Sequence, residues 1–198
     1  MLVPVVLCAA LASSAFGAFN ADQYIDSILR DLPLQFKVKG NGLLNRDLKV
    51  NVTQGSIIGL GSVLRRGHCT YGIAAGEYKL GCYVSLGAVR VLLNADVKGD
   101  SLIANTHSIS TTTLVEDSSY ALIEVQGRPG SIGRLSNVSL SPLTMTSSVT
   151  QGKLDLNSAR ISDFVRQLNA ALATQISSAM RGPFANVLST LISNRPFP

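Results

Sequence analysis

Charged and aromatic residues are scarce in this chain of 198 residues. Asp, Glu, Lys and Arg make up 15% of it and aromatic residues 6%, whereas hydrophobic residues make up 46%. Such a chain is not disordered, because it has enough apolar surface to form a core or to enclose a ligand. The net charge of +5 is scattered, and Arg65-Arg66 is its one basic pair. With few aromatic residues and no nucleic-acid motif, we expect no nucleic-acid partner.

Residue patterns typical of catalysis are also missing. The two histidines, His68 and His107, are expected at the surface. The segment Gly130-Ser131-Ile132-Gly133 is not a nucleophile elbow, because Pro129 stands two residues before the serine. Gly59-Leu60-Gly61 lacks the third glycine of a dinucleotide-binding loop. No acidic residue lies in an apolar context that would raise its pKa. We therefore predict no enzymatic activity, no catalytic residue and no cofactor.

The N-terminal segment has the pattern of a signal peptide. Residues 2–12 are apolar, no charged side chain occurs before residue 18, and Ala15-Phe16-Gly17 places small residues where a signal peptidase reads. The apolar run is shorter than the roughly 20 residues that a membrane-spanning helix needs. We therefore predict a signal peptide at 1–17, a secreted protein with no transmembrane segment, and a single domain at 18–198, which is long enough for one core.

Cysteine is scarce, and two of its three occurrences lie beyond the predicted signal peptide. Cys69 and Cys82 form an even pair, which predicts one disulfide in an oxidising compartment. These cysteines and the two histidines lack the spacing of a zinc site, so we predict no metal. Two sequons begin at Asn51 and Asn137. Alternation places Asn51 on the polar face of its strand, so we expect a glycan there more than at Asn137.

The order of predicted elements is a short helix, many strands and a long helix. Asn20 is a suitable N-cap for the first helix, and Pro33 ends it. Residues 34–150 alternate apolar and polar side chains, which predicts an antiparallel meander. Within the apparent strand 78–97, Gly87 marks a change of phase, which predicts a bulge or bend. No helical pattern separates the strands, so a parallel sheet is not expected.

Helical spacing returns near the C-terminus for some thirty residues. Asn157 is a suitable cap, and Gly182-Pro183 predicts a kink or two abutting helices. Polar residues, Asn169 among them, fall largely on the face away from the apolar stripe. The predicted fold class is therefore α+β: a strongly curved antiparallel β-sheet wrapped around a long C-terminal amphipathic helix, with a short N-terminal helix.

The segment Gly55-Ser56-Ile57-Ile58-Gly59-Leu60-Gly61-Ser62-Val63-Leu64-Arg65-Arg66-Gly67 resembles one in the group 7 mite allergens. In the allergens a comparable segment joins the early strands. The layout is more distantly similar to the superfamily of bactericidal/permeability-increasing, juvenile-hormone-binding and takeout proteins. The resemblance implies a curved sheet around a long helix, with lipids or other apolar molecules bound between them. This chain differs from the allergens in having the cysteine pair Cys69 and Cys82.

Two functions follow as hypotheses. The first is a secreted, non-catalytic binding protein for lipids or other small hydrophobic ligands. The second is an extracellular interaction protein that recognises a host or microbial surface and has a solid core. Neither hypothesis specifies the ligand or an oligomeric state. Under the first, the predicted ligand-binding residues are apolar positions of the long helix and of the strands opposite it: Phe164, Leu168, Leu172, Ile176 and Met180 with Val50, Val52, Val84, Leu86, Val91 and Leu93.

Overall fold

The structure is a computed structural model that describes residues 21–31, 35–37, 42–45, 48–74, 76–99, 105–154 and 156–198. The predicted signal peptide at 1–17 and the predicted cap Asn20 lie outside these residues. Every strand pairing of the described residues is antiparallel. The α+β class predicted from the sequence is confirmed, with the strands divided between two sheets.

The first sheet, called sheet A, has strand order β1-β3-β7-β8-β11, and β2 also pairs with β3. Its strands are β1 Gln35–Lys37, β2 Gly42–Asn45, β3 Leu48–Ile58, β7 Arg90–Gly99, β8 Thr106–Val115 and β11 Met145–Gln151. The second, sheet B, has strand order β10-β9-β6-β4, and β5 also pairs with β6. Its strands are β4 Leu64–Arg65, β5 Thr70–Ala74, β6 Glu77–Ser85, β9 Tyr120–Gly127 and β10 Arg134–Leu140.

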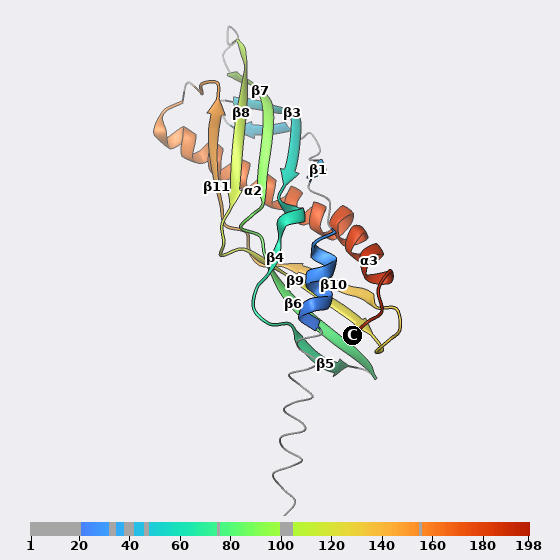
Figure 1. Cartoon of the computed structure of the whole chain (residues 1–198). Helices are drawn as coiled ribbons and strands as arrows, with labels where there is room; N and C mark the ends of the chain where they lie inside the picture. Colours follow the sequence, from blue (N-terminus) through green and yellow to red (C-terminus); the bar gives the residue numbers. More distant parts are fainter. Residues whose placement is uncertain are drawn as a thin grey trace, which may run out of the picture.

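The molecule is elongated, with sheet A at one end and sheet B at the other (Figure 1). Helix α2, Ser158–Ala179, runs along sheet A, and α3, Ala185–Ser193, lies beside sheet B. A further helix at residues 21–29 packs near α3 and β6. The long C-terminal helical segment therefore contacts both sheets and joins their cores.

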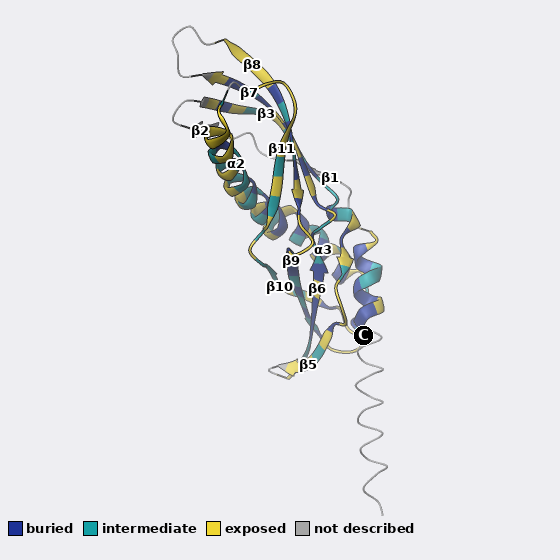
Figure 2. Ribbon diagram, turned by 90° about the vertical axis from the view of Figure 1, so that its left-hand side faces the viewer, coloured by how far each residue is buried: buried dark blue, intermediate teal, exposed yellow. Residues whose placement is uncertain are grey.

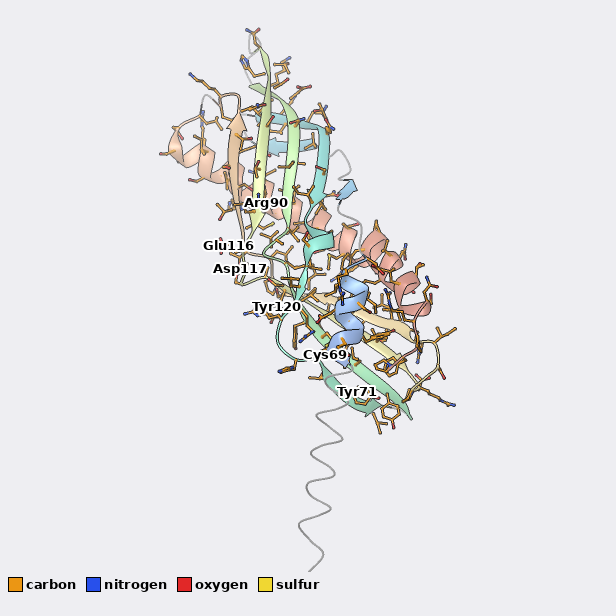
Figure 3. All side chains as sticks on the ribbon, viewed as in Figure 1. Cys69, Tyr71, Arg90, Glu116, Asp117 and Tyr120 are labelled. Carbon is orange, nitrogen blue, oxygen red and sulfur yellow. A yellow bond between two sulfur atoms is a disulfide. The ribbon has the colours of Figure 1, made fainter. Side chains whose placement is uncertain are left out.

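Gly87 does not lie in a bent strand, as the sequence predicted, but in a tight turn between the two sheets. The N–H of Leu86 donates to the carbonyl of Ser119 over 3.0 Å, and the N–H of Val89 donates to the carbonyl of Leu86 over 2.9 Å. A Cβ on Gly87 would lie 1.7 Å from the Asp117 Oδ1 atom. Asp117 stands at the junction of the sheets in Figure 3. The change of phase thus marks a change of sheet.

The segment that carries the family resemblance also crosses between the sheets. It begins within β3, continues through the 3-10 turn η1 at Leu60–Ser62 and ends after β4. Gly59 adopts a left-handed φ of 86°, and a Cβ there would lie 2.1 Å from the carbonyl oxygen of Ala88. Glycine is therefore required at this position for both conformation and space.

The long C-terminal helix begins as predicted and changes its winding near Pro183. The Asn157 side chain accepts a hydrogen bond from the N–H of Arg160 over 3.0 Å, which caps α2. At Met180–Phe184 the chain forms a π-helical turn, η2, which contains Pro183 and leads directly into α3. Because proline lacks an N–H, an altered turn lets the helix continue past it. The predicted interruption is thus a π turn.

The helix at residues 21–29 is fastened to the end of the chain. Tyr24 donates through its hydroxyl to the carbonyl of Ile192 over 3.4 Å, and its ring meets that of Phe197 edge-on at 6.2 Å. Arg195 donates to the carbonyl of Ser27 over 3.2 Å. Burial raises the pKa of Tyr24 to about 12, against the opposing effect of Arg195, so this hydroxyl remains a donor at neutral pH.

Candidate functional site

The candidate site is the interface between α2 and the inner face of sheet A. Along α2 every buried side chain recurs at a spacing of three or four residues, which places them on one face. This apolar stripe, from Phe164 to Met180, spans about 24 Å at 1.5 Å per residue. Figure 2 shows that the opposite face of α2 and its first turns are exposed. All five helix residues predicted for the site lie on this stripe and are at most 3% exposed: Phe164, Leu168, Leu172, Ile176 and Met180.

Four of the six predicted strand residues lie in sheet A. Val50, Val91 and Leu93 are at most 4% exposed, and Val52 is partly buried against the same core. Val91 pairs with Ile57 and Leu93 with Gly55 across the β3–β7 ladder. These residues therefore belong to the sheet that α2 covers (Figure 1).

The other two predicted residues lie away from this sheet. Val84 is in β6 of sheet B, where it pairs with Ala121 and Arg65, and Leu86 is in the turn between the sheets. Both are fully buried. Alternation correctly identified them as inward-facing, but it does not say which sheet a strand joins. The structure thus separates Val84 and Leu86 from the predicted residues on β3 and β7, which lie in sheet A.

A chain of polar groups that the sequence did not predict connects α2 to sheet A. Asn169 donates through Nδ2 to the carbonyl of Met145 over 3.0 Å, so its Oδ1 faces Ser147. Ser147 donates its hydroxyl hydrogen to that oxygen and can only accept from Thr113. The prediction that Asn169 lies away from the sheet is therefore wrong, because the residue lies at the edge of the apolar stripe and reaches β11.

A second inward-facing threonine has no such partner. Thr111 is 4% exposed, and its Oγ1 atom has no hydrogen-bond partner. It lies two residues before Thr113 on β8, so both side chains point to the same face of the sheet. The inner positions of β8 are thus Ile109, Thr111, Thr113 and Val115, all buried. Ser110-Thr111-Thr112-Thr113 is polar throughout, so no alternation of apolar and polar residues in the sequence marked these two hydroxyls as buried.

The predicted disulfide is confirmed and lies in sheet B. Cys69 precedes β5, Cys82 is in the neighbouring β6, and their Cα atoms are 4.4 Å apart. Both residues are buried.

The carboxylate of Asp22 lies beside Cys69. It accepts a hydrogen bond from the ring of His68 at 2.7 Å and lies 3.2 Å from a nitrogen of Arg65. This contact ties the helix at 21–29 to the disulfide-bonded segment.

An open groove of 490 Å³ lies between the helix at 21–29 and the η1–β4 segment. Its walls combine apolar Leu29, Val63 and Leu64 with charged Asp26 and Arg65. The Leu64 side chain is 72% exposed at this site. The groove therefore presents an apolar contact with charges beside it to the solvent.

Both predicted glycosylation sites are exposed in the structure. Asn51 lies in β3, next to buried Val50, on the outer face of sheet A. Asn137 lies in β10, where its Nδ2 donates to Glu124 Oε2 over 2.9 Å. Glycans at Asn51 and Asn137 stay predictions.

Within the described part of the chain, no cluster of three or more His, Cys, Asp or Glu residues is placed to hold a metal ion. None of its helices has the length and hydropathy needed to cross a membrane.

No family model matches the chain. The salivary anticoagulant protein P23 of Ixodes scapularis is 22% identical over 213 residues, which cover 96% of this chain and 94% of the relative. The resemblance to the group 7 mite allergens stays a prediction.

Two solved structures resemble the fold at 12% identity. The crystal structure of lipopolysaccharide binding protein matches 89% of this chain with a TM-score of 0.44, and the chain spans 40% of that protein's length. Takeout 1 of Epiphyas postvittana matches 79% of this chain and 74% of its own, with a TM-score of 0.32. Both TM-scores lie below 0.5, so neither neighbour says what this chain binds.

Proposed function

We propose that the protein is a secreted, non-catalytic binding protein for lipids or other small hydrophobic molecules, which it holds between α2 and sheet A. The observation that carries this proposal is the continuous apolar stripe from Phe164 in α2 to Met180 in η2, which shares one buried core with aliphatic residues of β3 and β7. The disulfide supports an oxidising, extracellular setting.

Binding at this interface needs no charged contact. Removing apolar surface from water stabilises a complex by roughly 25 cal/mol per Å², so an acyl chain enclosed between α2 and sheet A gains several kcal/mol. A side chain that lines a closed cavity is buried to the same extent as one in a solid core. The two arrangements differ in how they respond to added volume, and this difference provides the test.

The test is titration of delipidated protein with a fluorescent apolar probe, for wild type and for Leu172→Phe. Leu172 is 3% exposed at the centre of the stripe. If ligand space adjoins it, the larger ring fills that space, and the variant folds with near-normal stability and loses probe binding. The matched control is Leu188→Phe on α3, which is 1% exposed and lies beside sheet B. The control should lose stability and keep any probe binding.

The contradictory result is equally specific. In a solid core, the ring at Leu172 would overpack the interface and cost about 1–3 kcal/mol of stability. That loss, together with a wild-type protein that binds no probe, would leave the α2 stripe as ordinary core and refute ligand binding there.

The second candidate is an extracellular interaction protein with a solid core and no bound lipid, which recognises a host or microbial surface. The relative named as a salivary anticoagulant protein favours it, because the match extends over nearly the whole of both chains. The open groove beside Leu64 offers a contact surface. Prolonged plasma clotting by the purified protein, reduced in Leu64→Asp and unchanged by delipidation, would support this candidate.

A further inference from the structure

Thr111 carries an unused hydrogen-bonding group on the inner face of sheet A. Its side chain is 4% exposed, and its Oγ1 has no partner. A buried hydroxyl without a hydrogen bond is costly, so native structures pair nearly all such groups. Thr113, on the same face of the same strand, shows the usual arrangement, because its hydroxyl bonds to Ser147. Thr111 thus has no hydrogen-bond partner among the protein's own groups.

Thr111 lies on the inner face of sheet A, beside its edge strand. Thr111 pairs with Leu93 on β7 and with Val149 on β11. Leu93 is 4% exposed, whereas Val149 on the edge strand β11 is 36% exposed, so Thr111 lies beside the open edge of sheet A, between buried Ile109 and Thr113 along β8. Helix α2 runs from the outer end of sheet A toward the junction of the sheets (Figure 1), so a ligand along its stripe passes the inner face on which Thr111 lies.

The charges around this position select the chemistry of the ligand. Among the described residues, the buried polar or charged side chains are those of Asp22, Thr111, Thr113 and Ser119, and none is a cation. A buried carboxylate or phosphate would have no cation to pair with, which is strongly unfavourable. The hydroxyl of Thr113 has already donated its hydrogen to Ser147. Among the described residues of this face, the Thr111 hydroxyl is a donor without a partner, and its complement is an uncharged oxygen.

We propose that Thr111 binds the neutral oxygen of an amphipathic lipid, such as a long-chain alcohol or ester, whose hydrocarbon chain lies along the α2 stripe. The proposal rests on the proposed function and specifies which class of hydrophobic molecule the interface prefers. Ionised fatty acids are disfavoured, and alcohols and esters are favoured, because the former need a cation and the latter need one hydrogen-bond donor.

The test compares Thr111→Val with wild type in displacement of a fluorescent apolar probe by dodecanol, methyl dodecanoate, dodecane and dodecanoate. Valine keeps the branched shape and replaces the hydroxyl by a methyl group. The variant should bind dodecanol and the ester about 2- to 10-fold more weakly, the range expected for one neutral hydrogen bond. Dodecane should bind equally to both proteins. Thr111→Ser retains the hydroxyl and should retain the preference for dodecanol over dodecane.

Stability of the ligand-free protein provides a second readout. Because Thr111→Val removes an unpartnered hydroxyl, it should raise the melting temperature. The matched control, Thr113→Val, removes a hydroxyl that is bonded to Ser147 and should lower it. A lower melting temperature for Thr111→Val would mean that its hydroxyl is already paired, which overturns the proposal.

Different results would refute lipid binding between α2 and sheet A and the role of Thr111 in it. If the probe binds but Thr111→Val weakens dodecanol and dodecane equally, or weakens neither, lipid binding stands and the role of Thr111 is refuted. Stronger binding of dodecanoate than of its methyl ester at pH 7 also refutes it. If wild type binds no probe, both proposals fall together.

Discussion

The carboxylate of Asp22 accepts a hydrogen bond from the backbone N–H of Cys69 over 2.8 Å, across 47 residues of sequence. Burial of Asp22 by itself raises its pKa. The Cys69 N–H, the His68 ring and the Arg65 guanidinium outweigh burial and hold the pKa below its ordinary value. The ionised form of Asp22 therefore stabilises the contact between the first helix and the disulfide-bonded segment.

This depressed pKa predicts a loss of stability in acid. Asp22 binds fewer protons in the folded state than in the unfolded state between the two pKa values. Its contribution is complete above the unfolded value of about 3.9 and is lost as pH falls through the folded value. Asp22→Asn should lower the free energy of unfolding at pH 7 by about 1.5–3 kcal/mol, and the difference from wild type should shrink in acid.

Urea denaturation of both proteins at a series of pH values measures this effect. The control is Glu77→Gln, at the exposed ion pair with Arg134, which should change the midpoint little. A wild-type advantage over Asp22→Asn that is constant from pH 7 into acid would contradict the role assigned to Asp22.

The Cys69–Cys82 disulfide is expected to stabilise the protein by roughly 3 kcal/mol, the value of the chain-entropy model for a loop of about this length. Reducing the bond, or replacing both cysteines by alanine, should shift the denaturation midpoint accordingly. The measurement is denaturation with and without reductant, with thiol counting by mass spectrometry. Two free thiols in protein secreted without reductant would contradict the pairing.

Alanine substitutions at Gly59 and Gly67 test how tightly the segment that crosses between the two sheets is packed. Both have left-handed backbones, with φ of 86° and 73°. A Cβ on Gly59 would lie 2.1 Å from the carbonyl oxygen of Ala88, whereas Gly67 has nothing within 4 Å. Gly67→Ala should cost about 1–2 kcal/mol from backbone strain alone. Gly59→Ala should cost about 3 kcal/mol or more, because the backbone must also move. Equal losses in the two variants would refute this packing.

Much of the fold was predictable, because regular elements have local periodicity. The strand pattern across residues 34–150 predicted an antiparallel meander, and the helical spacing from Phe164 to Met180 identified the long helix and its buried face correctly. Periodicity does not reveal which strands share a sheet. It therefore placed Val84 with Val91, although the chain changes sheet at Gly87 between them.

The polar groups of the site were harder to predict, because their roles depend on partners distant in sequence. Asn169 is polar and lies beside an apolar stripe, so the helical pattern alone assigns it to solvent. Its contacts with Met145 and Ser147 arise only when α2 packs on β11. Thr111 is a common strand residue, and its importance lies in a missing hydrogen bond that no sequence pattern records.

Glycosylation provides a test of which strand faces are outward. Asn51 and Asn137 are both exposed, but the Asn137 amide is bonded to Glu124. We expect a glycan on Asn51 in protein secreted by eukaryotic cells, with lower occupancy at Asn137. Asn51→Gln should remove most of the mass lost on endoglycosidase treatment, and Asn137→Gln should remove less. No change of mass in the treated wild type would refute both sites.

The central claim is that α2 and sheet A enclose an apolar molecule. Its most direct test is extraction of the protein from its native secretory source into organic solvent, followed by mass spectrometry of the extract. We predict about one apolar molecule per chain, carrying an uncharged oxygen. Correctly folded, disulfide-bonded protein that releases no apolar molecule would contradict the claim and leave the interaction protein as the better account.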